Sequence, residues 1–493
     1  MSAIWRVPDC PSSVRLYHCI RRCNGETDDI LELEDLLSQV KVYGRSVDTA
    51  GPIFTNRVCD GPRPRDQTIR LRPQGMTILS RYGFDQEDKR ASTASREALR
   101  CLANAFLLND DCRQMFVDVG YAPKAADRLK VDDRDDEFLI SRMLFLCTYN
   151  TKLDFESLIK SNGLATSINQ QLARHAKVFS SKSGRRKSDA NPMQDQALVE
   201  TSKLMFNITY YYPDQVSAFT PAIEPLISLL LNHPLPSPPL QPPITYLLNA
   251  LLNLDLSAAD KKTPMGPAPK SSPLFPYSSP ESVADRLCTI FNKAIVTMPE
   301  KELDQAAAPI CTLIRRQYAL AYPQMKEWMR MILLPKARDR DKPLGVGETM
   351  AARLLRLSCC PSLPTLRENI SGLLFELSDS DASKFVKNIG YGFASGFLMN
   401  NNIEIPSNAA EASSIASDGS TEPGAEYNPV TGQRYSEEEK DAPKSPEMTQ
   451  EEKEREAERL FVLFERLKAT GVVDVKNPVQ EAVESGRFEE LPD

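Results

Sequence analysis

The sequence predicts an all-α superhelical solenoid of the armadillo or HEAT type, on two observations. Aromatic residues make up only 7% of the 493-residue chain and glycine occupies 21 positions, which disfavours strand-rich folds with their many turns. Apolar segments of about 10 to 16 residues also recur, at a spacing near the period of armadillo or HEAT units once loop insertions are removed. These segments are REALRCLANAFLLND (96–110), FLISRMLFLCTYNT (138–151), ALVETSKLMFNITYYY (197–212), PITYLLNALLNLDL (243–256), MAARLLRLSCC (350–360) and LRENISGLLFELS (366–378).

The first and third segments share a motif in which a base precedes an amide by one helical turn. Arg100 stands before Asn104, and Lys203 stands before Asn207. On a helical wheel Asn104 lies opposite an apolar stripe, and in a solenoid that opposite face lines a groove. An amide there would offer donors and an acceptor to the backbone of a bound guest. The alternative is that Asn104 and Asn207 only bond the backbone of their own repeat. The apolar stripe consists of Leu99, Leu102, Ala103 and Phe106.

Changes of composition divide the chain into a solenoid and a C-terminal region. We predict a solenoid over residues 1–400, with mobile loops at about 180–195 and 257–282, where polar, basic or proline-rich residues replace core formers. Residues 401–447 are rich in Ser, Glu, Gly and Pro, and we predict a disordered acidic linker.

A C-terminal amphipathic helix is predicted over residues 448–472, followed by an acidic tail over 473–493. Thr449 and Glu452 form a capping-box signature at its start, and Gly471 ends it. Because this helix is tethered after a long linker, its apolar face must dock either on the solenoid or on a partner. That face consists of Leu460, Leu463, Phe464 and Leu467.

Several hydroxyl groups of the linker stand close to acidic residues, which suits an acid-directed protein kinase. A phosphate would add about two negative charges at each site. The alternative is a solvated acidic linker without modification. The candidate phosphorylation sites are Ser417, Ser420, Thr421 and Ser436.

Charge and hydropathy narrow the class of protein. The net charge of -7 argues against nucleic acid as the main ligand, because no broad basic face is implied. No apolar stretch approaches the roughly 20 residues that a membrane-spanning helix needs. The start, MSAIWRVPDC, lacks the basic and apolar regions of a signal peptide, so we expect a cytoplasmic protein.

The chain also lacks a recognisable catalytic constellation. It has three histidines, no phosphate-binding loop and no nucleophile elbow, so we expect a binding protein rather than an enzyme, without a cofactor. Cys19 and Cys23, next to His18, would suggest zinc, but no second Cys/His cluster supplies further ligands. Ordinary packing of reduced thiols is therefore expected, and no metal.

Four stretches together resemble the synembryn family in order and spacing. They are ALRCLANAFLLN, KNIGYGFASGFLMNNNI, EYNPVTGQ and MTQEEKEREAERLFVLFERLKATGVV, and the insertions are similar to those of a fungal member. The resemblance implies a protein that binds heterotrimeric G-protein α subunits, as a folding chaperone and a non-receptor guanine-nucleotide exchange factor. It further implies that a concave groove takes the C-terminal helix of the α subunit, and that phosphorylation of an acidic segment enhances activity.

Under this resemblance, polar side chains of the repeats become candidates for holding the guest helix. Arg81 and Arg100 would pair with the carboxylate and acids at the guest's C-terminus, and the tethered helix would make a second contact. We expect a monomer that reaches the cell cortex through membrane-bound G proteins. The groove candidates are Arg81, Arg100, Asn104, Asn150, Lys203, Asn207, Asn249 and Asn253.

A different class of function remains open, namely an armadillo-type scaffold or adaptor that carries an extended peptide. Import adaptors of that kind use regular ladders of tryptophan and asparagine. Here Trp5 and Trp328 are the tryptophans of the whole chain, which disfavours this alternative.

Overall fold

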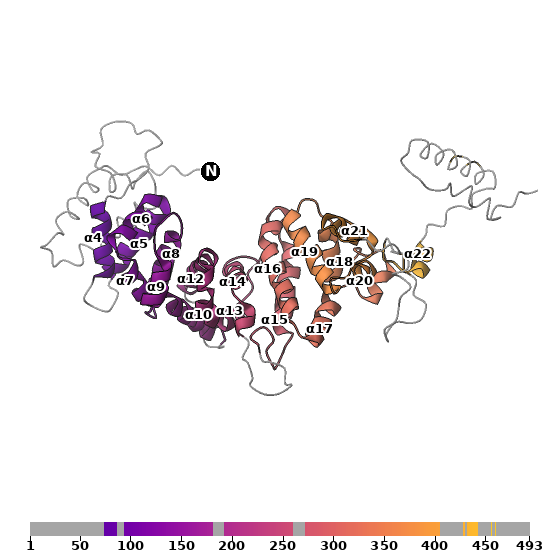
Figure 1. Cartoon of the computed structure of the whole chain (residues 1–493), viewed down its shortest axis with the longest axis horizontal. Helices are drawn as coiled ribbons and strands as arrows, with labels where there is room; N and C mark the ends of the chain where they lie inside the picture. The colour runs from indigo at the N-terminus through magenta and orange to yellow at the C-terminus, as the bar shows by residue number, and fades with distance from the viewer. Residues whose placement is uncertain are drawn as a thin grey trace, which may run out of the picture.

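A computed structural model describes most of the solenoid and part of the segment that follows it. It covers residues 73–85, 93–180, 192–259, 272–404, 427–428 and 431–441, together with the single positions 455 and 459. Within these residues the regular structure is helical, apart from isolated β-bridges. The helices stack side by side into an elongated molecule, from α4 (Pro73–Phe84) at one end to α21 (Tyr391–Asn400) near the other, with α22 (Tyr435–Asp441) beyond it (Figure 1). The predicted fold class, an all-α solenoid, is confirmed.

One row of helices runs along the middle of the stack, and each of its members packs on the next. We call it the central row, and it places side chains from consecutive repeats next to one another. It consists of α5 (Thr93–Leu108), α8 (Arg134–Cys147), α12 (Pro192–Tyr211), α14 (Ile244–Leu252), α16 (Glu300–Leu320) and α19 (Pro364–Leu377).

A second row follows one side of the central row (Figure 1). It consists of α7 (Ala122–Arg128), α9 (Phe155–Asn162), α10 (Leu164–Ser180), α13 (Ile223–Asn232) and α15 (Ser282–Thr297). The other elements are α6 (Asp110–Val119), η1 (Pro213–Ala222), η2 (Leu256–Ala259), α17 (Pro323–Leu333), η3 (Ala337–Asp341), α18 (Met350–Ser358), α20 (Ala382–Ile389) and α22 (Tyr435–Asp441).

Local signals set many of the helix ends. The side chains of Asn109, Asp133 and Asp381 each accept a hydrogen bond from a backbone N–H in the first turn of α6, α8 and α20, respectively. Gly120 and Gly163 follow α6 and α9 in the left-handed region, with φ of 83° and 66°, which a glycine adopts without steric cost. These caps keep each repeat short and return the chain to the next one.

The apolar stripe predicted on α5 is buried in the continuous core. Leu99, Leu102 and Phe106 have no exposed surface, and burial of each side chain stabilises the fold by roughly 2 kcal/mol. The ring of Phe106 lies 5.2 Å from that of Phe116 in α6. The apolar segments predicted to be helices coincide, within a few residues, with α5, α8, α12, α14, α18 and α19.

Three predicted segments need correction, namely the two loops and the linker. Residues 192–195 belong to α12, and residues 272–280 form a packed turn whose Leu274 and Phe275 are buried, so the predicted loops are shorter. The predicted disordered linker 401–447 contains a docked part, because residues 431–434 bond the end of the solenoid and α22 follows them directly. Within these loops and this linker, the residues outside the described part of the chain are 181–191, 260–271, 405–426, 429–430 and 442–447.

The described helices show no candidate for a membrane span, since none combines sufficient length with sufficient hydropathy.

Candidate partner-binding face

Aromatic side chains from the central row form one continuous surface, which we call the aromatic face. The rings of Phe145 and Tyr149, at the end of α8, lie 5.4 Å apart, and Tyr149 lies 6.3 Å from Tyr211 of α12. Tyr210 continues the surface, with its ring 5.2 Å from that of Tyr211. The aromatic face consists of Phe145, Tyr149, Phe206, Tyr210, Tyr211 and Tyr246.

Lys203 of α12 joins the rings of three helices. Its Nζ lies 5.5 Å from the ring centre of Phe145 in α8 and 4.9 Å from that of Tyr246 in α14. Glu200, one turn before it, accepts a hydrogen bond of 3.0 Å from the same ammonium. The lysine is thereby held between the rings at their faces, where a cation is attracted by the ring quadrupole.

Tyr210 and Tyr211 are the most open part of the aromatic face. Their exposed fractions are 63% and 48%, which is high for neighbouring aromatic residues on a packed helix. Neighbouring exposed rings of this kind make the surface a candidate for an interaction site. Tyrosine supplies a large contact area with few rotatable bonds, so it loses little entropy on binding.

Charged pairs border the aromatic face on the side of α5. Arg100 bonds Glu97 in its own helix and lies 3.0 Å from Asp135 of α8. Arg142 of α8 lies 3.2 Å from Glu200 of α12. The motif shared by the two sequence segments therefore corresponds to matching ion pairs, Arg100 with Glu97 and Lys203 with Glu200.

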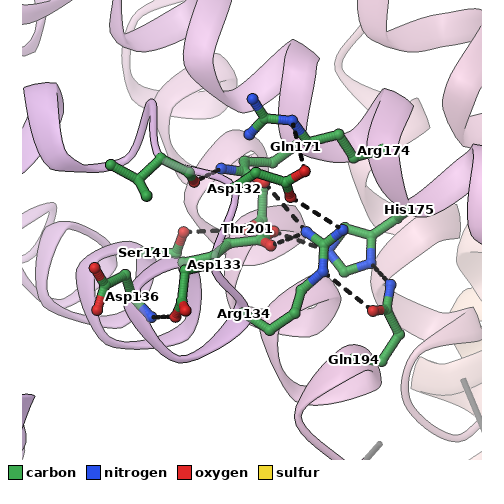
Figure 2. A network of polar contacts seen from close by, with 12 residues as sticks. Asp132, Asp133, Arg134, Asp136, Ser141, Gln171, Arg174, His175, Gln194 and Thr201 are labelled. Carbon is green, nitrogen blue, oxygen red and sulfur yellow. Dashed lines mark hydrogen bonds and ion pairs between the residues drawn. The ribbon is translucent and has the colours of Figure 1, made fainter. Parts of the chain in front are cut away.

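A buried polar network fixes α8, α10 and α12 beneath this surface, and Figure 2 shows His175 and Thr201 converging with their neighbours. The carboxylate of Glu137 accepts bonds of 2.9 Å from His175 Nε2, 2.7 Å from the Thr201 hydroxyl and 2.6 Å from Arg134. Gln194 contacts the other ring nitrogen of His175. Since every one of these side chains is buried or nearly so, the network holds α8 against α12 in one arrangement.

The pKa of Glu137 reflects this environment. Burial alone would raise it, but the charge and hydrogen bond of His175, with Arg134 and Thr201, together hold the pKa of this carboxyl below its usual value. Glu137 is therefore ionised at neutral pH, as a carboxylate with several donors should be.

The predicted groove residues differ in how exposed their side chains are and in whether they bond within the fold. Asn104 and Asn249 are half-buried on α5 and α14, and the side chain of neither makes a hydrogen bond within the described residues. Asn150 is exposed, with φ of 56°, and its amide lies 3.4 Å from Asp110. Arg81 is exposed near the end of α4. These residues are accessible, and their contact with a guest stays a prediction.

Asn207 and Asn253 correct the prediction that amides of the central row face a guest. Asn207 is only 5% exposed, and its amide donates a 2.7 Å hydrogen bond to the Thr148 hydroxyl at the end of α8. The amide of Asn253 donates to the backbone oxygen of Phe206 and to the hydroxyl of Thr209. Both amides therefore join neighbouring helices, because buried donors need a partner inside the fold.

The aromatic residues of the face were not among the residues predicted to bind a partner. A signal was present, since Phe145 and Tyr149, like Phe206 and Tyr210, stand four residues apart on the helix face that carries Lys203 or Arg142. Aromatic residues at this spacing usually pack in a core, and nothing in one segment shows that the rings of three helices meet.

The predicted C-terminal contacts fall mainly outside the described residues. Leu460, Leu463, Phe464 and Leu467 lie there, as do Ser417, Ser420 and Thr421. Ser436 is described, and it is exposed in the first turn of α22.

The comparison with known families agrees with this architecture. The sequence profile described as "Guanine nucleotide exchange factor synembryn" matches residues 36–487. The chain belongs to the synembryn family. The resemblance seen in the sequence is thereby confirmed.

Curated relatives carry names of the same kind. A synembryn-like chaperone of Schizosaccharomyces pombe is 33% identical over 175 residues, which is 34% of this chain and 33% of that protein. Chaperone Ric-8A of Bos taurus is 25% identical over 411 residues, 76% of this chain and 72% of the relative. The match thus spans a third of the yeast protein and most of the bovine one.

Solved structures similar to this chain include a designed armadillo repeat protein. It is 11% identical, with a TM-score of 0.32, and the alignment covers 73% of this chain and 99% of the designed one. A similarity this low adds nothing to the fold that the helices themselves define.

Proposed function

We propose that this chain binds heterotrimeric G-protein α subunits, as a folding chaperone and a guanine-nucleotide exchange factor, and that the aromatic face takes the C-terminal helix of the α subunit. The observation that carries the proposal is the open pair Tyr210 and Tyr211 on a surface built from three helices of the central row. The synembryn family and the chaperone names of the relatives support it.

An amphipathic helix suits the aromatic face better than an extended peptide. A helical guest presents apolar residues at intervals of three and four along one stripe, and such a stripe matches a compact cluster of rings. Its backbone is already satisfied by its own hydrogen bonds, so the surface need not offer a ladder of free amides. Asn207 and Asn253, which would be part of such a ladder, are used within the fold.

Cations at the border suit the end of a guest helix. Glu200 takes one bond each from Lys203 and Arg142, and a lysine has three donors while an arginine has five. The remaining donors can therefore receive a terminal carboxylate without leaving Glu200 unpaired. Arg81 and Asn104 extend this polar border toward α4 and α5.

Exchange needs no covalent chemistry in this arrangement. A protein that binds the nucleotide-free α subunit more tightly than the GDP-bound form must weaken GDP binding by the same factor. Withdrawing the C-terminal helix from the α subunit's own fold would loosen the nucleotide pocket. The same captured, nucleotide-free state is what a folding chaperone would hold during maturation of an α subunit.

The predicted C-terminal helix, with Leu460, Leu463, Phe464 and Leu467, would supply a second contact. Phosphorylation of Ser436 by an acid-directed kinase, and of the linker sites, would tune that contact through added charge. We further propose a monomer in the cytoplasm that reaches the cortex through membrane-bound α subunits.

The direct test measures GDP release from a purified α subunit with and without this protein. We expect acceleration by the wild type and its loss in a variant carrying Tyr210→Ala and Tyr211→Ala. Tyr277→Ala is the matched control, since that tyrosine is 78% exposed but lies outside the central row. Wild-type protein that leaves both GDP release and α-subunit folding unchanged would contradict the proposal.

A further inference from the structure

Arg340 is a buried arginine held by carbonyl groups and a ring. Its side chain is 8% exposed, in η3 near the end of the solenoid. One guanidinium nitrogen donates to the carbonyl of Gly432 at 3.0 Å. The other donates to the carbonyls of Lys387 and Asn388, at 2.7 Å and 2.9 Å. Its partners among the described residues are thus oxygens of α20 and of a segment far along the chain.

The ring of Tyr427 covers the same guanidinium. It lies 4.6 Å from the Arg340 guanidinium carbon, a distance at which a cation is attracted by the ring face. The carbonyls of Lys387 and Asn388 belong to the last turn of α20, where a helix leaves acceptors unpaired and favours a cation. Arg340 therefore satisfies a helix end and a distant segment at once.

That distant segment, which we call the clasp, consists of residues 427–428 and 431–441. It closes on itself, because the Gly432 N–H donates to the Asn428 carbonyl at 2.7 Å and a β-bridge joins Tyr427 to Arg434. The amide of Asn428 donates to both oxygens of Glu438 in α22 at 3.0 Å, which ties the helix to the turn.

Further bonds around Arg340 dock the clasp on the loop that follows η3. The N–H of Leu344 donates to the Thr431 carbonyl, and the N–H of Arg434 donates to the Arg340 carbonyl, both at 2.9 Å. Gly432 adopts φ of 69°, and a Cβ on it would collide with the side chain of Leu344. The fit is therefore specific for a glycine in the left-handed conformation at this point.

Burying a charged side chain in this way is costly unless all its donors have partners. If stability of the fold were the whole role, well-packed apolar residues would stabilise it as well. Burial lowers the pKa of Arg340, which nonetheless stays charged at neutral pH as arginines do. The planar guanidinium fixes how the clasp and the end of α20 are oriented, since it donates to acceptors on both. This role is that of an anchor for a segment of the chain.

We propose that Arg340 is a positioning residue: it anchors the clasp to the end of the solenoid and so fixes the point from which the C-terminal segment reaches the bound α subunit. This inference rests on the proposed function for its consequence in exchange. The anchor itself can be tested without any α subunit.

The clasp shortens the tether of the predicted C-terminal helix. From Asp441 the helix at 448 is about 7 residues away, a reach of at most about 25 Å. With the clasp open, the preceding described residue is Glu404, and the tether grows to about 44 residues. The effective concentration of a tethered contact falls as roughly the −3/2 power of tether length, so it would drop about 16-fold.

The first experiment measures amide hydrogen exchange in the full-length protein without an α subunit. Arg340→Lys keeps the charge but replaces the planar fork, whose two nitrogens reach both sets of carbonyls, with a single ammonium, and Gly432→Ala perturbs the clasp from its own side. We expect the amides of Gly432 and Arg434 to exchange at least about tenfold faster in either variant, while α19 keeps its protection. Arg338→Ala is the control, since Arg338 is exposed in the same turn. Unchanged protection in Arg340→Lys would overturn the anchor.

The second experiment measures GDP release from an α subunit with the same variants, below saturation. We expect a loss on the order of tenfold, as the tether argument gives. Binding of a peptide with the sequence of the guest's C-terminal helix should stay within about twofold, because the aromatic face is untouched. Variants whose clasp is open in the first experiment but which release GDP from the α subunit as fast as the wild type does would overturn the positioning role. A wild-type protein that neither accelerates GDP release nor assists α-subunit folding would instead refute the proposed function, with the anchor still decided by the first experiment.

Discussion

Among the places where a cation lies against an aromatic ring in the described residues, two differ clearly in what covers them. Lys203 lies between Phe145 and Tyr246 on the central row, and the neighbouring Tyr210 and Tyr211 stand open to solvent. Arg340 lies against the ring of Tyr427, and the clasp of the same chain covers it. Similar contact chemistry thus holds a segment of the same chain where it is covered, and we propose that it holds a partner where it is left open.

The largest expected effect comes from removing the open rings. Tyr210→Ala with Tyr211→Ala should weaken binding of a peptide that carries the guest's C-terminal helix by about 2 kcal/mol or more, roughly thirtyfold, as for central aromatic residues of interfaces. Thermal stability should change little, since both rings are exposed. Titration calorimetry measures the first quantity and differential scanning calorimetry the second. An unfolded variant, or unchanged peptide binding, would remove the aromatic face from the account.

The second prediction separates the face from the C-terminal segment. Deleting residues 448–493 should slow GDP release while the affinity for the isolated peptide stays within about twofold, because the peptide contacts only the open region. Stopped-flow release of a fluorescent GDP analogue and peptide titration give the two numbers. Equal losses in both would mean that the two regions do not act as separate contacts.

The third prediction distinguishes two asparagines that share a sequence motif. Asn207→Ala should lower the free energy of unfolding by about 1 to 2 kcal/mol, since it leaves the Thr148 hydroxyl without its donor. Asn104→Ala should cost less than about 0.5 kcal/mol and act on partner binding instead. Urea unfolding of both variants decides the matter, and the reverse order of stabilities would contradict the placement.

These residues show which features of the fold and of the candidate site can be predicted from the sequence. Periodicity predicts the central helices and the buried stripe of Leu99, Leu102 and Phe106, because local spacing decides which face is apolar. The same spacing cannot tell Asn104 from Asn207, since only the latter meets Thr148 of another repeat. The docking of residues 431–441 was not predicted, because it depends on Arg340, which lies far away in the sequence.

The smallest effect at neutral pH concerns the network beneath the aromatic face. The pKa of Glu137 is lower in the folded protein than its ordinary value of 4.5, so the unfolded chain binds more protons as the pH falls through that range. The stabilisation is therefore complete above pH 4.5 and is lost as the pH falls below it. Urea unfolding at a series of pH values should show this slope, and Glu137→Gln should flatten it. A slope unchanged by the substitution would assign the acid sensitivity to other groups.

The measurement that tests the central claim most directly is a double comparison of GDP release. An intact α subunit and one lacking the last turns of its C-terminal helix are each combined with the wild type and with the variant carrying Tyr210→Ala and Tyr211→Ala. We expect acceleration with the intact pair alone, and no further loss when both changes are made together. Acceleration that survives truncation of the helix, or losses that simply add, would show that the open aromatic face is not where the helix binds.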